Sequence, residues 1–167
     1  MNGIEEVKSF DDLEIIDFKH LGQGYIAKVK VARHKVTGKE YAVKIINKLK
    51  VSKGELEALR RELQIQKMLQ HEHIVKMHTS FEKDGYLYIV LEYIKQGNLF
   101  EFLRKRNLSQ EQVLNIFYQI LTAIDYLHDK QILHRDIKPE NVLMENKDKI
   151  KLCDFGFCAF YGKNVVR

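Results

Sequence analysis

Residues 132–143 read "ILHRDIKPENVL" and place three side chains suited to phosphoryl chemistry within six positions: Asp136, Lys138 and Asn141. A carboxylate can accept the proton of a hydroxyl group. A nearby ammonium can stabilise the charge of a phosphoryl group, and an amide oxygen can bind magnesium. The alternative interpretation is a charged surface turn, and the residues that follow in the chain argue against it.

The triplet Asp154-Phe155-Gly156 supplies a second candidate ligand for a metal ion. Asp154 follows Asn141 by 13 residues, and the chain between them reads as two short strands joined by the polar turn "NKDK" at 146–149. A small hairpin of this length returns the chain beside its starting point. We therefore predict that Asn141 and Asp154 share one metal site.

The stretch "LGQGYIAKV", residues 21–29, has glycine at two positions and Ala27 where a third glycine is usual. Gly22 and Gly24 let the backbone approach a ligand closely, so that N–H groups can face phosphate oxygens. A tight hairpin turn is the plainer interpretation. The stretch lies between two predicted strands, which argues against a dinucleotide-binding site, and it lacks the Lys-Ser/Thr ending of a Walker loop.

Two charged residues in apolar surroundings form a candidate pair. Lys44 lies inside the predicted strand "YAVKII", and Glu62 lies in "RRELQIQ" on the predicted helix that follows. Taken separately, Lys44 is explained as a lysine that extends to solvent at the edge of a sheet. Glu62 is explained as a member of a surface ion pair on a helix. Taken together, they predict an ion pair that holds the amine toward a nucleotide phosphate.

Composition excludes several classes of protein. The 167 residues are 45% hydrophobic and 31% charged, and the net charge of +5 is spread over interspersed signs, which favours a mixed solvated surface over a nucleic-acid site. Cys153 and Cys158 match no zinc spacing and no disulfide framework, which indicates a reduced intracellular compartment. No signal peptide or membrane-spanning stretch is visible, so we expect a soluble cytoplasmic or nuclear protein without a membrane partner.

The histidines give no clear indication of a metal site. His71 and His73 lack a recognisable third ligand for a metal ion, and His134 is interpreted as a packing residue.

The predicted fold class is α+β, with a β-rich half followed by a helical half. Strands are expected at 17–24, 27–35 and 39–47, a helix at 54–70, and two further strands at 76–83 and 86–93 with the turn signal Asp84-Gly85 between them. In the helix at 54–70, Leu56, Leu59, Leu63 and Met68 are the expected apolar face. A short helix at 97–106 and a long helix at 109–129 follow, and the apolar arc of the long helix is wide enough to pack on two sides. The predicted organisation is an N-terminal extension at 1–17, a lobe of five strands and one helix at 18–94, and a partial helical lobe at 95–167.

In this order and spacing, the motifs resemble those of a eukaryotic protein kinase from about residue 18 to residue 167. Lys138, two residues after Asp136, resembles the serine/threonine class. Gln66, in "RRELQIQ", is similar to Aurora-like and polo-like kinases, and the tail "GKNVVR" resembles the Aurora segment just before its phosphorylated threonines. The resemblance implies catalytic roles for Asp136 as base, Lys138, Lys44 and Glu62, with Mg²⁺ at Asn141 and Asp154.

The resemblance also implies ATP as the cofactor and a protein with serine or threonine as the substrate. Leu91 would be the gatekeeper, the backbone of Glu92 and Ile94 would bind adenine, and Asn98 would lie near the ribose. The implied ATP-binding residues are Leu21, Gly22, Gln23, Gly24, Tyr25, Ile26, Ala27, Lys28, Val29, Ala42, Lys44, Leu91, Glu92, Ile94, Asn98, Glu140, Leu143 and Asp154. Ala27 and Ile26 depart from the family pattern without excluding ATP.

A family member would continue beyond Arg167, and the chain holds no serine or threonine between Asp154 and Arg167 where an activating phosphosite is expected. We therefore expect a fragment of a serine/threonine kinase that is inactive toward peptides by itself and unstable or self-associating. The alternatives are a short, catalytically dead regulator of a full-length relative and, less favoured, a basic nucleic-acid-binding domain. Regulatory partners and the physiological substrate are not indicated by the sequence.

Overall fold

The computed structural model describes residues 7–23 and 27–161, and the chain divides into two compact units. Unit 1 comprises Met1–Glu57 and Lys76–Tyr93, and unit 2 comprises Ala58–Val75 and Ile94–Arg167. This grouping differs from the expected lobes by placing residues 58–75 with the helical part. The reason is that Ile65, Leu69 and Ile74 belong to the hydrophobic core of unit 2.

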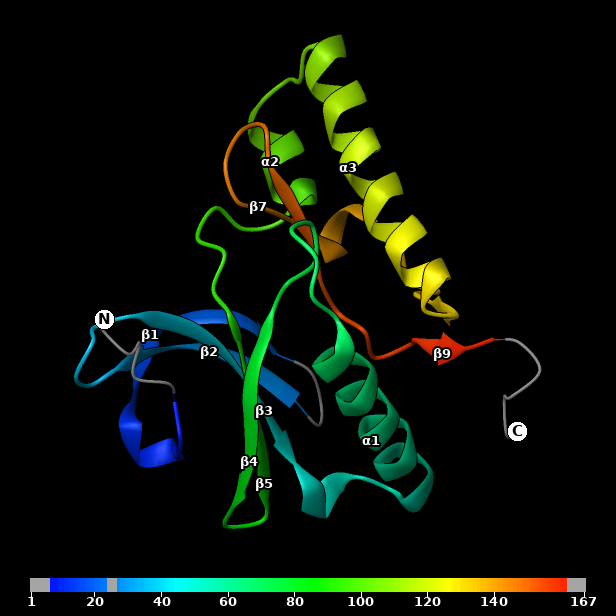
Figure 1. Ribbon diagram of the computed structural model, residues 1–167. Helices are drawn as coiled ribbons and strands as arrows, with labels where there is room; N and C mark the ends of the chain where they lie inside the picture. The colour runs from blue at the N-terminus through cyan, green and yellow to red at the C-terminus, as the bar shows by residue number, and fades with distance from the viewer. Residues whose placement is uncertain (1–6, 24–26, 162–167) are drawn as a thin grey trace, which may run out of the picture. The chain divides into compact units, whose positions relative to one another are not determined.

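Unit 1 is built on a five-stranded antiparallel sheet in the order β1-β2-β3-β5-β4 (Figure 1). Its apolar core includes Leu13, Tyr41, Val43 and Val90. The strands are β1 (Leu13–Gln23), β2 (Ala27–His34), β3 (Glu40–Asn47), β4 (Met77–Lys83) and β5 (Tyr86–Glu92), with single 3₁₀ turns η1 (Phe10–Asp12) and η2 (Lys48–Lys50).

Two details of unit 1 bear on the sequence predictions. β1 begins at Leu13, inside the stretch expected to be an N-terminal extension, because Leu13 and Ile16 are buried and Leu13 pairs with His34 of β2. The predicted turn between β4 and β5 is confirmed: Asp84 has φ 51° and Gly85 has φ 78°. These positive angles are typical of the hairpin turns that favour Asp-Gly.

Helix α1 (Lys53–Met68) contributes residues to both units. The expected apolar face was partly wrong, because Met68 is 45% exposed. The buried side chains are instead Glu62, Ile65, Gln66 and, just past the helix, Leu69. This set keeps the three- and four-residue spacing of one helix face, but two of its members are polar, so a search for apolar residues alone misses it.

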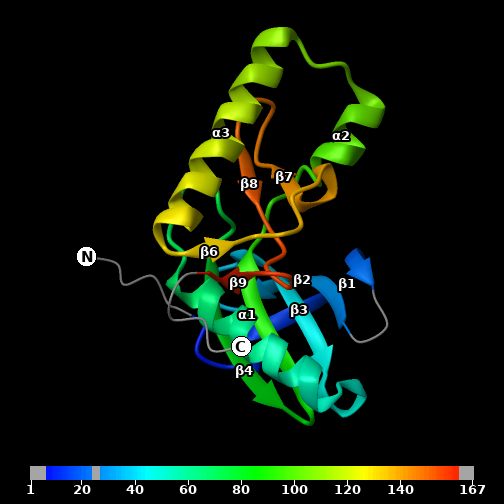
Figure 2. The ribbon, with the colours of Figure 1, turned by 90° about the vertical axis from the view of Figure 1, so that its right-hand side faces the viewer.

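Unit 2 places a β-hairpin between two helices. Strands β7 (Val142–Met144) and β8 (Ile150–Leu152) form the hairpin, and Figure 2 shows α2 (Leu99–Lys105) and α3 (Gln110–Asp129) on its two sides. The short strands β6 (Ile132–Leu133) and β9 (Ala159–Phe160) pair with each other, and a 3₁₀ turn, η3 (Pro139–Asn141), precedes β7. The core contains Leu127, Met144, Leu152 and Phe155, each at most 1% exposed.

A buried glutamine on α3 anchors the tip of this hairpin. Gln119 is 5% exposed; its Nε2 donates to the Asp148 carbonyl at 2.7 Å, and its Oε1 accepts from the Ile150 N–H at 3.0 Å. Asn115 Nδ2 donates to the same carbonyl at 2.7 Å. The hairpin therefore meets α3 through satisfied polar contacts as well as apolar packing.

The other face of α3 carries large apolar side chains that nothing in the described part of the chain buries. Val113, Leu114, Phe117, Tyr118 and Leu121 are 47–66% exposed. The buried face is confined to Ile116, Gln119, Ala123 and Leu127. The expectation that this helix has two apolar sides agrees with this pattern.

No helix in the described ranges has the length and hydropathy needed to span a bilayer.

We predict that Gln119→Leu lowers the free energy of unfolding by about 1–3 kcal/mol, because the Asp148 carbonyl and the Ile150 N–H lose their buried partner. Urea denaturation followed by circular dichroism at 222 nm suits a chain that contains no tryptophan. Gln110→Leu, at the exposed start of the same helix, is the control and should change stability by less than half as much. Equal effects in the two variants would contradict the anchoring role of Gln119.

We also predict concentration-dependent self-association of the chain through the exposed face of α3, because apolar patches of several hundred Å² drive association. Sedimentation velocity should show a larger species that shrinks in the variant Leu114→Glu/Phe117→Glu. Glu111→Gln and Asp125→Asn together serve as a control on the same helix. A monodisperse monomer at every concentration would refute this expectation.

Candidate active site

Three polar side chains meet at Asp136 in the loop between β6 and η3. Lys138 Nζ donates to Asp136 Oδ2 at 2.8 Å, and Asn141 Nδ2 donates to the same oxygen at 2.8 Å. Asn141 Nδ2 also contacts the Asp136 carbonyl at 2.9 Å. Asp136 is thus oriented from two directions, and its side chain remains 20% exposed to solvent.

The ion pair determines the protonation states of its two members. The Lys138 ammonium, with a smaller contribution from Asn141, holds the pKa of the Asp136 carboxyl below its usual range. Reciprocally, the Asp136 carboxylate raises the pKa of Lys138. At neutral pH the site therefore offers an ionised carboxylate, able to accept a proton, next to a cation.

His134 links this loop to the segment that carries Asp154. It is buried, its Nδ1 accepts the Asp136 N–H at 3.3 Å, and its Nε2 lies 3.1 Å from the Cys153 carbonyl. These contacts select the neutral tautomer with the proton on Nε2. Burial lowers the pKa of His134, which keeps the ring neutral. Its ring also packs edge-on against Phe155 at 5.0 Å, so the structure agrees with the interpretation of a packing residue.

The hairpin β7–β8 returns the chain to Asn141. Val142 pairs with Leu152, and the Cys153 N–H donates to the Asn141 carbonyl at 2.9 Å. The backbone of Asp154 consequently follows directly after the residue bonded to Asn141, as the spacing predicted. The shared metal site itself stays a prediction.

The donor atoms near the end of this hairpin fit a magnesium ion bound together with phosphates. Asn141 commits its Nδ2 to Asp136, so its amide oxygen is the atom that can bind a cation. Asp154 adds a carboxylate, and Mg²⁺ is usually held by one or two carboxylates, phosphate oxygens and waters. No cluster of three His, Cys, Asp or Glu side chains suited to a metal ion occurs in the described residues.

Two residues of the site have backbone angles in the left-handed region. Arg135 has φ 66° and Asp154 has φ 60°. Arg135 is held there by a hydrogen bond from its Nε to the Phe157 carbonyl at 2.6 Å. Non-glycine residues in this region cost about 1–3 kcal/mol and concentrate at functional sites.

Glu62 of α1 belongs to the same unit as this loop. It is buried, and its Oε2 lies 3.7 Å from the position that a Cβ on Gly156 would occupy. Gly156 therefore leaves room beside two carboxylates, those of Glu62 and Asp154. The predicted partner Lys44 lies on β3 of unit 1, opposite Ile89 and Val29. The ion pair between Lys44 and Glu62 would join the two units and stays a prediction.

The residues expected at the nucleotide are distributed over both units. Leu21, Gly22 and Gln23 end β1, while Ala27, Lys28 and Val29 begin the antiparallel strand β2; Gly24, Tyr25 and Ile26 lie outside the described residues. Ala42 of β3 pairs with Leu91 of β5, next to the pair of Tyr41 and Glu92. In unit 2, Ile94 is buried, Glu140 is exposed in η3, and Asn98 forms a bridge with Leu143.

Asn98 has a structural role that sequence reasoning did not assign. Its Oδ1 accepts the Glu101 N–H at 2.9 Å and caps the start of α2. The signal was available, because asparagine before a run such as "LFEFL" is a preferred helix cap. Its predicted position near the ribose stays a prediction.

Cys158 was also not assigned a place in the site. It is buried, its Sγ donates to the His134 carbonyl at 3.6 Å, and burial raises its pKa to about 12, with Glu62 contributing. The thiol is therefore protonated and unreactive at neutral pH. Only the fold, which returns residue 158 under the loop at 134, brings these groups together.

Comparison with known proteins identifies the family. A model described as the protein kinase domain matches residues 15–166. The chain is 44% identical over 153 residues to "Serine/threonine-protein kinase SIK2" of Gallus gallus, an alignment that covers 91% of this chain and 19% of that protein. It is also 44% identical over 142 residues to "Serine/threonine-protein kinase SIK1" of Mus musculus, covering 84% and 18%.

These relatives qualify the narrower resemblance. They bear SIK names, not Aurora or polo names, and the chain spans about a fifth of their length. The match nevertheless extends across the sheet of unit 1, the loop at Asp136 and the triplet at Asp154. The chain belongs to the protein kinase domain family.

Proposed function

We propose that this protein transfers the γ-phosphoryl group of ATP to serine or threonine hydroxyls of other proteins. The observation that carries the proposal is the Asp136 carboxylate, oriented by Lys138 and Asn141 and kept ionised by the adjacent cation. Family membership and the two relatives named as serine/threonine kinases support it.

In the proposed reaction, Asp136 accepts the proton of the substrate hydroxyl while the oxygen of that hydroxyl forms a bond to the γ-phosphorus of ATP. The bond between that phosphorus and the bridging oxygen breaks, and ADP leaves. Lys138, whose ammonium lies 2.8 Å from the Asp136 carboxylate, neutralises charge on the transferred group. Positioning and charge stabilisation supply most of the rate in this class of reaction.

Magnesium bound with ATP would supply the charge neutralisation at the phosphates. The Asn141 amide oxygen and the Asp154 carboxylate are the proposed ligands, and Lys44, supported by Glu62, is the proposed phosphate contact. Glu62 is suited to this role because it is a buried carboxylate on helix α1. The other nucleotide contacts are proposed at the β1–β2 turn, at Ala42 and Leu91, and at the backbone of Glu92 and Ile94.

The kinase subfamily and the location in the cell are proposed on separate observations. Gln66, which is buried one turn past Glu62, supports membership of an Aurora-like or polo-like subfamily. The SIK1 and SIK2 relatives support a SIK-like subfamily instead. The tail at 162–167 lies outside the described residues. We propose an intracellular location, supported by two cysteines that form no disulfide in the described part of the chain.

The second candidate function is a short, catalytically dead regulator of a full-length relative. Sequencing the transcript beyond codon 167 separates the two proposals. An open reading frame that continues into a further helical lobe supports the enzyme. A stop codon at that point, together with Mg–ATP binding without turnover, supports the regulator.

We predict that Asp136→Asn, in the longest form that the transcript encodes, lowers kcat by at least about 100-fold, because the proton acceptor is lost. Phosphate transfer from radiolabelled ATP to a degenerate serine/threonine peptide library measures the change. Binding of a fluorescent ATP analogue should be retained. Asp125→Asn, an exposed aspartate on α3, is the matched control and should keep full activity. Comparable turnover in both variants would overturn the assignment of the base.

We predict that Lys138→Met raises the pKa of the Asp136 carboxyl toward its ordinary value, because its largest stabilising contact is removed. With Lys138 present, the pKa is depressed, so the pair stabilises the fold above the unfolded pKa and loses this effect as the pH falls through the folded pKa. Carbon-13 NMR of the aspartate carboxyls over an acid titration measures the shift. Lys147→Met, in the β7–β8 turn, is the control; an unchanged Asp136 titration in Lys138→Met would contradict this electrostatic role.

A further inference from the structure

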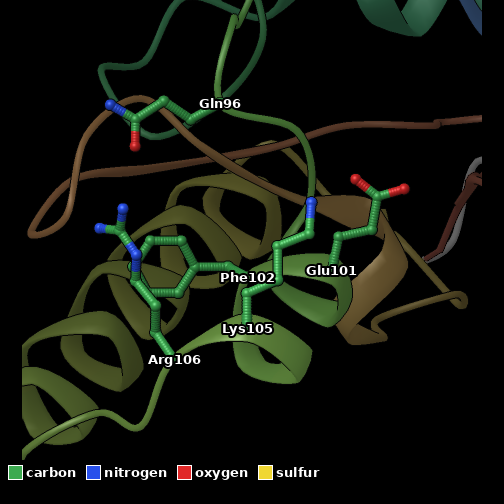
Figure 3. A pocket seen from close by; sticks show the side chains of 5 residues that line it. All are labelled: Gln96, Glu101, Phe102, Lys105 and Arg106. Carbon is green, nitrogen blue, oxygen red and sulfur yellow. The ribbon is translucent and has the colours of Figure 1, made fainter.

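A cavity of about 340 Å³ lies in unit 2 between α2 and the segment that leads into it. Figure 3 shows its lining side chains, which are Gln96, Glu101, Phe102, Lys105 and Arg106. Cavities of about 300–1,000 Å³ are the usual size for ligand sites. None of the five residues has a role in the proposed phosphoryl transfer.

The guanidinium group of Arg106 is held in place on one wall. Its central carbon lies 5.4 Å from the centre of the Phe102 ring. The backbone N–H of Arg106 donates to the Phe102 carbonyl at 3.0 Å, which fixes the Arg106 backbone at the end of α2. Arginine stacked on an aromatic ring is stabilised by cation–π attraction and keeps its planar set of donors in a fixed plane. In Figure 3 the Gln96 amide lies across from this guanidinium group.

The basic residues of the cavity are not neutralised by partners in the described chain. Neither Lys105 nor Arg106 forms an ion pair with any residue in 7–23 or 27–161. Their place at the end of α2 is favoured by the helix dipole, which explains basic residues there in general. The dipole does not account for a cavity in which an amide and a stacked guanidinium group face each other.

The charges of the residues that line the cavity indicate which kind of ligand it would bind. Lys105 and Arg106 contribute two positive charges and Glu101 one negative charge, so one carboxylate would neutralise the cavity. A phosphate group carries about −1.5 to −2 charges at neutral pH and would leave an excess of negative charge beside Glu101. Carboxylates also match the planar donor geometry of arginine.

We infer that this cavity binds an acidic side chain, aspartate or glutamate, presented by a peptide segment of a partner protein. The carboxylate pairs with Arg106 and Lys105 and accepts a hydrogen bond from the Gln96 amide. Charge-assisted hydrogen bonds of this kind contribute about 1.5–3 kcal/mol each, which corresponds to roughly tenfold or more in affinity.

The test uses the 167-residue chain and a fluorescein-labelled hexaglutamate peptide, followed by fluorescence anisotropy at fixed ionic strength. Lys105→Gln and Arg106→Gln should each weaken binding by about tenfold. Arg104→Gln is the matched control, because Arg104 is exposed on the same helix but does not line the cavity, and it should change affinity less than about twofold. Circular dichroism of each variant verifies that α2 and α3 remain folded.

A second measurement locates the binding site. In a nitrogen-15 NMR titration with hexaglutamate, the side-chain amide signals of Gln96 should shift, and hexaglutamine should leave them in place. Equal loss of affinity in all three variants would show nonspecific attraction to a basic surface and overturn the inference. Unshifted Gln96 signals, or tighter binding of a phosphoserine peptide than of hexaglutamate, would also overturn it. No nucleotide is used, so the outcome does not depend on the proposed kinase function.

Discussion

The hydrogen bond from the Cys153 N–H to the Asn141 carbonyl closes the hairpin on which the candidate site depends. It joins the end of the loop that carries Asp136 to the start of the segment that carries Asp154. His134 forms a second connection between the same two segments through the Cys153 carbonyl. At the other end of the hairpin, Gln119 holds the turn against α3. The relative position of Asp136, the proposed base, and Asp154, the proposed metal ligand, is therefore set by backbone geometry, which is more rigid than contacts between long side chains.

Electrostatics then assign a role to each group. Lys138 beside Asp136 keeps the carboxylate ionised, whereas burial keeps His134 neutral and Cys158 protonated. An exposed charged pair thus lies near two uncharged, buried titratable groups: His134 in the same loop, and Cys158 from a segment 24 residues further along the chain. The difference follows from solvent access and neighbours alone. It separates the groups that can exchange protons with a substrate from those that support the loop.

Much of this arrangement could be anticipated. The spacing of Asn141 and Asp154 with a polar turn between them predicted the hairpin, and Asp84-Gly85 predicted the turn between β4 and β5. The long helix was expected to begin at residue 109, and in the structure the Ser109 side chain accepts the Gln112 N–H at the start of α3. These are local features, determined by a few neighbouring residues whose backbone preferences and hydrogen bonds do not need the rest of the fold.

Other features were not accessible from local patterns. The buried face of α1 includes Glu62 and Gln66, and the buried face of α3 includes Gln119, so polarity gave the wrong indication of which residues are inside. A buried polar group is stable only if distant residues supply its partners, such as the Asp148 carbonyl and the Ile150 N–H for Gln119.

The sequence by itself determined the family motifs, most of the strands and helices, and the chemical identity of the groups around Asp136, because these depend on residue type and short spacing. The tertiary structure decided which polar residues are buried, which apolar face of α3 remains exposed, and which titratable groups are charged. It also brought Cys158 beneath His134 and placed Gln96 across from Arg106. These outcomes depend on contacts between residues far apart in the chain, and desolvation is a property of the folded surroundings and not of the residue alone.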